Sequence, residues 1–316
     1  MTLSKPKILI LGASSFLTKP LVKKLVIKNK FKIFCQSRSN LKKHFNSNQS
    51  DITYLETNFL NKKYDQRFFK NYSFIINFVN ASVLTEEELS NFRVFLKNIL
   101  EISRASFIHI STASVYGDCK SKLISEFSEC SPKNRYQKIK YEDENFLQKI
   151  SNSLNIKCFI LRPTEIIGDY SLNARKFIKS YRKASIIKRY FIKSFYGKRI
   201  SHFVSSKYLI ENILKIIEKK VKPGIYLISQ DENKLNNFSN ICKILDSKIY
   251  KTTQKERYYF FVLPLEWLFN IIYRFCRPNQ VSPYSIFSSK QPIIDPKKYL
   301  HFERDLLDHI NSILES

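Results

Sequence analysis

Short apolar runs alternate with amphipathic segments along the first half of the chain. The runs are rich in β-branched residues and have the length of buried strands. They cover residues 7–11, 31–35, 53–55, 74–79, 106–110 and 157–163. Apolar residues with helical spacing predict helices between them, at residues 16–26, 86–103 and 136–154. Because strands alternate with helices through short connections, we expect an α/β fold with a mostly parallel sheet and helices on both faces.

The pattern becomes less regular after residue 168. Further helices are expected at residues 173–183, 206–219, 236–245 and 303–314, with a strand at 225–228. The sequence therefore predicts one domain over residues 1–168. A smaller, discontinuous lobe over residues 169–316 follows, and some of its segments return to the first domain.

The most apolar stretch of the second half covers residues 257–278. Pro264 is suited to open a helix there, and the apolar residues that follow it have helical spacing. The stretch is too short and too charged to span a bilayer, which needs about 20 apolar residues. It either packs as a cap on the second lobe, which we favour, or lies on a membrane surface as a peripheral contact. The apolar run 8–11 is too short for a signal peptide or a membrane span, which leaves it as the first strand.

The chain is strongly basic, with 54 Lys and Arg against 27 Asp and Glu and a net charge of +27. Such a charge suits phosphate groups, an anionic membrane or a nucleic acid. Because the basic residues are spread along the chain, we expect a solvated basic surface and no nucleic-acid binding. The six cysteines form no C-x-x-C pair and the five histidines form no ligand cluster. These observations favour a reducing compartment, a cytoplasmic location and no bound metal.

The candidate chemistry lies in residues 111–117 and 136–140. Thr112 follows the strand 106–110 and lies at the carboxyl end of that strand, where open α/β sheets bind ligands. Tyr136 and Lys140 are four residues apart, so they share one face of the helix that begins there. A lysine ammonium beside a phenol lowers the phenol's pKa and makes it a usable base. Three such groups suit proton removal from a hydroxyl while a hydride leaves the same carbon; the alternative is that each is an ordinary solvated side chain.

The first strand ends at Gly12 and leads into a helix. A strand, a glycine turn and a helix begin a dinucleotide-binding unit, in which the helix N-terminus offers N–H groups to a pyrophosphate. The second strand lacks the acidic residue that binds an adenosine ribose, and Gln36 follows it instead. Arg38 comes next but one, and its guanidinium suits a 2′-phosphate. This favours NADP slightly over NAD, the alternative for Arg38 being a solvated loop position.

With Gly12, Thr112, Tyr136 and Lys140 in this order, the chain resembles the extended short-chain dehydrogenase/reductases, the NAD-dependent epimerase/dehydratase family of sugar-nucleotide enzymes. The resemblance is dense from residue 7 to 168 and thin afterwards. The family pattern at the first turn is Gly-x-x-Gly-x-x-Gly, and here Ser15 and Thr18 stand where the second and third glycines belong. The resemblance implies a Rossmann-type doubly wound sheet, a smaller C-terminal substrate-binding lobe, and a homodimer packed through helices that include the Tyr136 helix.

The resemblance also implies roles for individual residues. Tyr136 would be the acid/base, Lys140 would lower its pKa and hold the nicotinamide ribose, and Thr112 would bind the reacting oxygen. The residues expected to bind the cofactor are Gly12, Ser14, Ser15, Phe16, Leu17, Arg38, Asn58, Val79, Asn80, Lys140 and Pro163. Those expected to bind the substrate are Thr112, Ser114, Tyr136 and Arg199.

The implied activity is NAD(P)-dependent oxidoreduction or isomerisation of a nucleotide-linked sugar. Dehydratases of the family carry an Asp-Glu pair directly after the serine or threonine, but here Ala113 and Ser114 follow Thr112. This leaves an epimerase or a ketoreductase, between which the sequence does not decide. Because the glycine motif is altered and the ribose acid is missing, the alternative is a catalytically impaired relative that acts as a binding or scaffold protein.

Overall fold

The computed structural model describes residues 5–38, 51–59, 71–168, 172–196, 199–218, 221–250, 285–297 and 301–315. The chain forms two compact units, each assembled from separate stretches of sequence. Unit 1 comprises residues 1–112, 135–162 and 210–226. Unit 2 comprises residues 113–134, 163–209 and 227–316.

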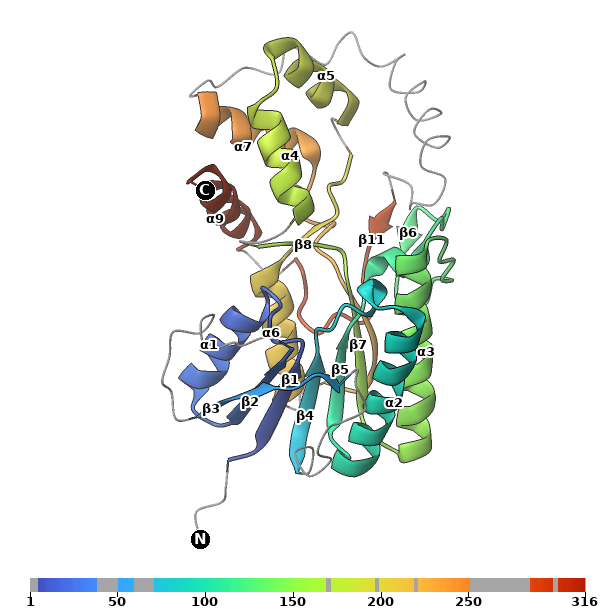
Figure 1. Cartoon of the computed structure of the whole chain (residues 1–316). Helices are drawn as coiled ribbons and strands as arrows, with labels where there is room; N and C mark the ends of the chain where they lie inside the picture. The colour runs from blue at the N-terminus through green and yellow to red at the C-terminus, as the bar shows by residue number, and fades with distance from the viewer. Residues whose placement is uncertain are drawn as a thin grey trace. The chain divides into compact units, whose positions relative to one another are not determined.

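Unit 1 is built on a seven-stranded sheet with the strand order β10-β7-β5-β4-β1-β2-β3 (Figure 1). The strands are β1 (Lys7–Leu11), β2 (Lys32–Ser37), β3 (Ile52–Glu56), β4 (Tyr72–Asn77), β5 (Ser106–Ile110), β7 (Cys158–Pro163) and β10 (Gly224–Ile228). The order reverses between β1 and β4, which makes this pair the topological switch point where doubly wound sheets bind ligands. The predicted Rossmann-type α/β fold is confirmed.

Both faces of the sheet are covered. Successive side chains of a strand point to opposite faces, and all of Ile8, Leu9, Ile10 and Leu11 are fully buried. Leu9 and Leu11 belong to a core cluster with apolar residues of α2 (Glu86–Ser103) and α3 (Arg135–Leu154). These two helices lie side by side along the sheet (Figure 1).

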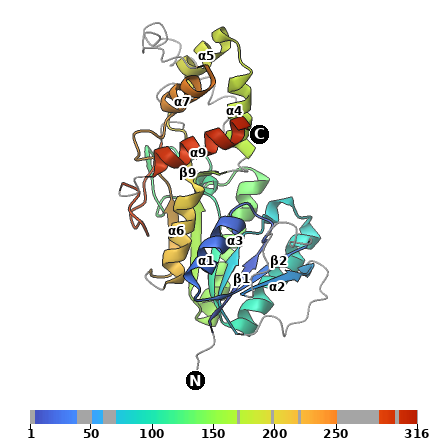
Figure 2. The ribbon, with the colours of Figure 1, turned by 90° about the vertical axis from the view of Figure 1, so that its left-hand side faces the viewer.

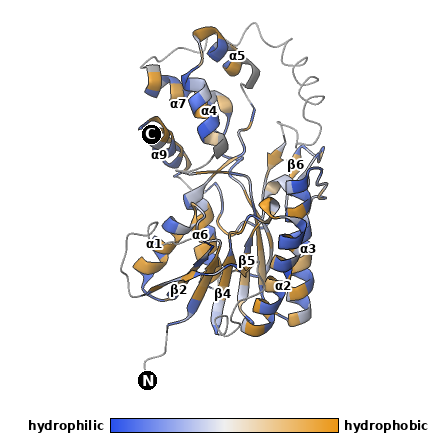
Figure 3. Cartoon of the chain, viewed as in Figure 1, coloured by the Kyte–Doolittle hydropathy of each residue, from blue (hydrophilic) through white to orange (hydrophobic). Residues whose placement is uncertain are grey.

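The helices α1 (Thr18–Lys28) and α6 (Ser206–Ile217) are joined by ion pairs. Lys24 pairs with Glu211, and Lys28 pairs with Glu218 at 2.8 Å. These side chains are about one-third exposed, so the pairs add little to stability and mainly fix which helix faces which. The helix α3 shows both hydrophilic and hydrophobic bands (Figure 3), as expected of a helix with one buried face.

Unit 2 contains the helices α4 (Leu172–Arg182), α5 (Ile186–Tyr196), α7 (Phe238–Tyr250) and α9 (Phe302–Glu315) (Figure 2). Apolar residues of α4, α7 and α9 form one buried cluster around Tyr181 and Phe302. Two short parallel pairs complete the unit: β6 (Leu123–Ile124) with β11 (Ile286–Phe287), and β8 (Glu165–Ile167) with β9 (Phe203–Ser205). The predictions included neither α5 nor these four short strands.

None of the described helices is both long and apolar enough to cross a bilayer. The described part of the chain also contains no group of three or more His, Cys, Asp or Glu placed to hold a metal ion. The segment 257–278, predicted either to cap the second lobe or to contact a membrane, lies outside the described residues.

Candidate functional site

The junction between β5 and α3 carries the three residues predicted to be catalytic. Thr112 lies two residues beyond the end of β5, and Tyr136 is the second residue of α3. Lys140, one turn further along α3, donates from Nζ to the carbonyl oxygen of Ile110 at 3.1 Å. Since Ile110 is the last residue of β5, this hydrogen bond brings the Tyr136 face of α3 to the carboxyl end of the strand that leads to Thr112.

The two ends of this helix face differ in exposure. Tyr136 is 39% exposed, whereas Lys140 is only 5% exposed. Desolvation lowers the pKa of Lys140, and the carboxylates of Asp143 and Glu144 oppose that effect. A buried ammonium of this kind acts on its neighbours with little screening by water.

A buried polar chain lies beneath this face. Glu144, one turn after Lys140, accepts from Nε of Arg162 at 3.1 Å and from its Nη2 at 2.6 Å. The Ser111 hydroxyl donates to the same carboxylate. Both charged side chains are almost fully buried. A two-point arginine–carboxylate pair is rigid, so it fixes α3 against β7 and against the residue that precedes Thr112.

His109 of β5 is the second buried polar group near Lys140. The Asn77 amide oxygen accepts from the Val79 N–H at 3.0 Å, which turns its NH₂ group toward Nδ1 of His109 at 3.2 Å. Nδ1 is then the acceptor, and the proton is on Nε2, which has no hydrogen-bond partner among the described residues. Desolvation and, second, the charge of Lys140 hold the pKa of His109 well below its usual value of 6.5, so the ring is neutral.

The turn after β1 depends on one glycine. Gly12 has φ of +70°, and a Cβ at this position would lie 2.9 Å from the backbone nitrogen of Val79. Only glycine accepts this conformation and this approach without strain. Gln36, at the place of the expected ribose acid, is buried; its Oε1 accepts from the Gly12 N–H at 3.4 Å, and its Nε2 donates to Thr57 O at 2.6 Å.

The turn after Gly12 is two residues longer than predicted, because the helix was expected to begin at residue 16. Helix α1 begins at Thr18, and its N-terminus has no side-chain cap. Ser14 is exposed, Ser15 and Phe16 are half-buried, and Leu17 is buried in the core. The Leu17 side chain therefore cannot face a ligand, and its N–H donates to Ser15 Oγ at 3.4 Å. Thr18 is fully buried, and its hydroxyl has no partner within the described chain.

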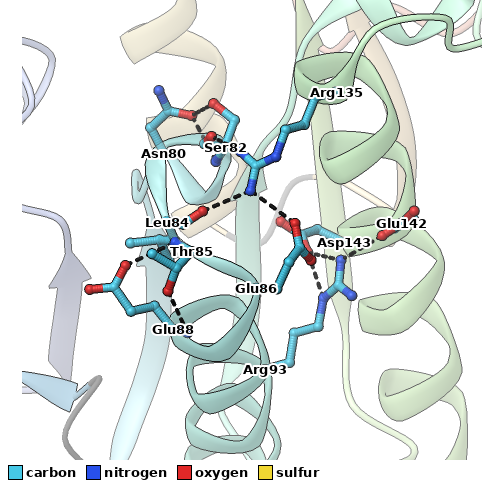
Figure 4. A network of polar contacts seen from close by, with 10 residues as sticks. All are labelled: Asn80, Ser82, Leu84, Thr85, Glu86, Glu88, Arg93, Arg135, Glu142 and Asp143. Carbon is cyan, nitrogen blue, oxygen red and sulfur yellow. Dashed lines mark hydrogen bonds and ion pairs between the residues drawn. The ribbon is translucent and has the colours of Figure 1, made fainter.

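The turn after β4 is held by the helix of Tyr136 (Figure 4). Strand β4 ends at Asn77, two residues earlier than predicted, so Val79 and Asn80 lie in this turn. Arg135, at the start of α3, donates to the carbonyl oxygens of Ser82 and, at 2.8 Å, of Leu84. The Asn80 amide oxygen accepts from the Ser82 hydroxyl at 2.8 Å. The turn predicted to lie under the cofactor and the helix predicted to carry the base are thus one connected structure.

The remaining predicted residues are dispersed. In unit 1, Arg38 and Asn58 are exposed after β2 and β3. In unit 2, Pro163 is buried at the end of β7, Ser114 is half-buried, and Arg199 is only 1% exposed. The structure therefore brings together the predicted residues of β1, β4, β5 and α3 within unit 1.

Sequence reasoning missed the buried groups that support this junction: His109, Ser111, Glu144 and Arg162. One signal was available, because Glu144 follows Tyr136 and Lys140 at the same four-residue spacing and so shares their helix face. The partners of these groups come from separate strands, and nothing in one sequence announces such pairings.

Comparisons with known proteins agree with this architecture. The UDP-glucuronic acid 4-epimerase of Bacillus cereus, solved with NAD, is 16% identical, with a TM-score of 0.65 over 98% of this chain and 99% of the epimerase. The UDP-N-acetylglucosamine 4-epimerase of Methanobrevibacter ruminantium, solved with UDP-N-acetylmuramic acid, is 14% identical, with a TM-score of 0.67 over 99% of both chains. A dTDP-glucose 4,6-dehydratase of Bacillus anthracis, solved with NAD, is 12% identical, with a TM-score of 0.63 over 98% of this chain and 97% of the dehydratase.

At sequence identities this low, the similarity to these structures supports the fold alone. No curated protein sequence matches the chain. The family model described as the NAD dependent epimerase/dehydratase family, however, matches residues 8–229, which is more than half of the chain. The match runs from β1 to the residue after β10 and so includes the whole sheet of unit 1. On this match the protein belongs to the NAD-dependent epimerase/dehydratase family.

Proposed function

We propose that the protein is an NAD(P)-dependent epimerase or ketoreductase that acts on a nucleotide-linked sugar, with Tyr136 as the acid/base. The observation that carries the proposal is the hydrogen bond from Lys140 Nζ to Ile110 O at 3.1 Å. It places the ammonium at the end of β5, on the helix face of Tyr136 and two residues from Thr112. Family membership and the nucleotide-sugar enzymes among the structural neighbours support the substrate class.

Each of the three residues has a distinct part in this proposal. The exposed Tyr136 takes a proton from the substrate hydroxyl and returns it in the reverse direction. The buried Lys140 ammonium stabilises the phenolate, because opposite charges favour each other's charged form. Thr112 donates or accepts a hydrogen bond at the same oxygen and holds it in place. Tyr136 and Thr112 therefore act on one oxygen atom of the sugar, and Lys140 acts through Tyr136.

The residues around Gly12 fit a dinucleotide. The turn leaves the α1 N-terminus without a side-chain cap, and backbone N–H groups at a helix start suit a pyrophosphate. Gly12, Ser14 and Ser15 would hold the pyrophosphate, and Val79 and Asn80 would border the dinucleotide from β4. When bound, NAD(P) supplies the hydride acceptor and donor. Gln36 carries no negative charge that would repel a 2′-phosphate, and Arg38 nearby is exposed. We therefore propose that the protein prefers NADP to NAD.

The class of reaction is argued from the residues after Thr112. Elimination of water from a sugar needs further acid/base groups, and Ala113 and Ser114 provide no carboxylate. An epimerase or a ketoreductase needs the hydride transfer that the dinucleotide would supply and one proton transfer at the same hydroxyl group, which Tyr136 would perform. We also propose a cytoplasmic homodimer packed through helices that include α3, to be measured by light scattering.

The proposal is tested by titrating the purified protein with NADPH and with NADH, followed by nicotinamide fluorescence. We expect saturable binding at micromolar concentrations, with NADPH preferred. In a screen of nucleotide sugars, Tyr136→Phe should lower kcat by about 10²-fold or more, the usual contribution of a general acid/base, and should retain cofactor binding. Tyr141→Phe, on the same helix one residue after Lys140, is the matched control and should retain activity. Equal activity of both variants would refute the role of Tyr136.

Two observations favour a second candidate, a binding or scaffold protein that has lost cofactor affinity. The Gln36 side chain already occupies the Gly12 N–H, and the buried Thr18 stands where close helix packing favours glycine. Under this hypothesis the folded protein binds neither nicotinamide dinucleotide, in reduced or oxidised form. That outcome would exclude the enzyme and leave partner binding as the function.

A further inference from the structure

The helices α4 and α5 of unit 2 form a basic surface without acidic residues. The sequence contains no aspartate or glutamate between Asp169 and Glu211. Five basic side chains of this region are exposed: Lys176, Lys179, Arg182, Lys183 and Lys188. None of the four lysine ammonium groups pairs with a carboxylate of the described residues, whereas Lys193 on the other side of α5 does. The charge of these four lysines is therefore available to an anionic partner.

Among the described residues, α5 contacts the rest of unit 2 through Lys193 and Ile192. Lys193 pairs with the Asp246 carboxylate of α7, which also accepts from the Tyr181 hydroxyl at 2.8 Å. Ile192 packs against the buried cluster of unit 2. These contacts determine which side of α5 faces inward, so the opposite side is turned outward by the fold.

Three apolar side chains in the first half of α5 are exposed. Ile186 is 74% exposed, Ile187 71% and Phe191 47%. Ile187 and Phe191 are one turn apart and share a helix face, and Ile186 precedes them at the start of the helix. We call these three exposed side chains the apolar ledge. Scattered exposed apolar residues are ordinary, but three together at the edge of a basic surface call for a partner. Hydrophobic positions interrupted by hydrophilic ones are also visible along α5 in Figure 3.

We propose that the α4–α5 surface docks on an anionic lipid bilayer. Exposed lysines are attracted to anionic headgroups, and branched aliphatic side chains gain free energy when they enter the headgroup–acyl boundary. A nucleic acid would use the charge but has little use for two adjacent isoleucines, because bases are bound by aromatic stacking and hydrogen bonds. The basic surface and the apolar ledge together match a membrane surface in charge and in polarity.

The lysines and the apolar ledge respond differently to salt. Each lysine near an anionic membrane contributes about fivefold to the partition coefficient, and salt screens this contribution. The apolar ledge is insensitive to screening but is too small to hold the protein on its own. Binding is therefore reversible and peripheral, and needs both anionic lipid and the three apolar side chains.

The experiment is flotation of the full chain with vesicles of phosphatidylcholine alone or mixed with phosphatidylglycerol, at low and at high salt. We expect the protein to float with the mixed vesicles at low salt and to stay behind with pure phosphatidylcholine or at high salt. Failure of the folded protein to float with mixed vesicles at low salt would overturn the proposal. Equal flotation with both compositions would overturn its electrostatic part and the identification of an anionic surface.

Variants locate the surface. The triple variant Ile186→Ser, Ile187→Ser, Phe191→Ser should lose roughly tenfold or more of the partition coefficient, and Lys183→Gln with Lys188→Gln about fivefold for each charge removed. The matched control is Lys23→Gln with Ile27→Ser on α1, where Ile27 is as exposed as Ile186. Its binding should equal that of the parent protein. If the triple variant floats as fully as the parent, another part of the chain binds the lipid and the proposal is wrong.

Discussion

Two strand-to-helix junctions of unit 1, β5–α3 and β1–α1, are stabilised in opposite ways. At β5–α3, side chains hold the geometry: Lys140 binds the strand end, and Glu144 binds both Ser111 and Arg162. At β1–α1, the backbone holds the geometry through Gly12, and Thr18 contributes no hydrogen bond of its hydroxyl within the described chain. The β5–α3 junction is held by several charged and polar side chains, whereas the β1–α1 junction depends chiefly on the backbone conformation of Gly12, with the Gln36 side chain against its N–H.

This difference indicates where the chain tolerates change. A junction held by side chains keeps its positions even when neighbouring residues differ, because each contact restrains the same geometry. A junction held by backbone geometry tolerates small side chains, such as Ser15 at the second glycine position, as long as Gly12 remains. The altered glycine motif and the complete Thr112, Tyr136 and Lys140 set are thus compatible within one fold.

The largest effect is expected at the side-chain junction. Glu144→Ala leaves the Arg162 guanidinium buried without its carboxylate, and breaking a buried pair in this way costs about 3–5 kcal/mol. The free energy of unfolding, measured in urea, should fall by that amount. Glu142→Ala is the control, because Glu142 is exposed and its pair with Arg93 is worth about 1 kcal/mol at most.

A double variant sharpens this prediction. Glu144→Leu with Arg162→Met removes both charges and keeps an apolar interior, so it should be more stable than Glu144→Ala alone. If the double variant is the less stable of the two, the Arg162 charge has another buried partner and the pair is not the element that determines the junction.

The second effect tests the backbone junction. Gly12→Ala places a side chain at φ of +70°, at a backbone strain of about 1–3 kcal/mol, and presses its Cβ against Val79 N. We expect a lower midpoint of urea unfolding and weaker dinucleotide binding. Ser14→Ala, two residues away and exposed, should change the free energy of unfolding by about 0.5 kcal/mol or less. Equal effects of the two substitutions on the free energy of unfolding would mean that the turn does not depend on Gly12.

The sequence predicts those parts of the structure that depend on residues close to one another in the chain. Strands such as 7–11 and 106–110 have uninterrupted apolar runs, and α3 has a face marked by Tyr136 and Lys140, so both were predicted within a few residues. The two- and three-residue strands of unit 2 are too short for any periodicity. Helix α5 was missed because several of its apolar side chains are exposed, which breaks the usual relation between hydrophobicity and burial. The roles of Tyr136, Lys140 and Gly12 remain predictions.

A pH titration connects the two junctions, because His109 lies beside Lys140 and is bound through Asn77 to the turn near Gly12. Its pKa is well below 6.5 in the folded state, chiefly through desolvation. Below pH 6.5 the imidazole of residue 109 binds a proton in the unfolded chain but not in the folded protein. The free energy of unfolding therefore falls as the pH falls, by at most about 1.4 kcal/mol per pH unit. His109→Gln should flatten this dependence between pH 6.5 and 5, approximate bounds set by the ordinary histidine pKa.

The control for that titration is Ser14→Ala, which changes no titratable group and should keep the slope of the parent protein. An unchanged slope in His109→Gln would mean that His109 is protonated in the folded protein, and that the two junctions are not linked by a neutral ring.

The smallest effect is expected where the chain departs from the family pattern. Thr18 is fully buried and its hydroxyl has no partner within the described chain, so the group loses its hydration on folding and regains nothing. Thr18→Val keeps the shape and removes the hydroxyl, and it should raise the free energy of unfolding by about 1 kcal/mol, at the lower end of the cost of an unpaired buried polar group. Thr18→Ser keeps the hydroxyl and loses a methyl group, so it should be less stable than the parent protein. A destabilised Thr18→Val would show instead that the hydroxyl is hydrogen-bonded, and that the β1–α1 junction, like β5–α3, depends on a side chain.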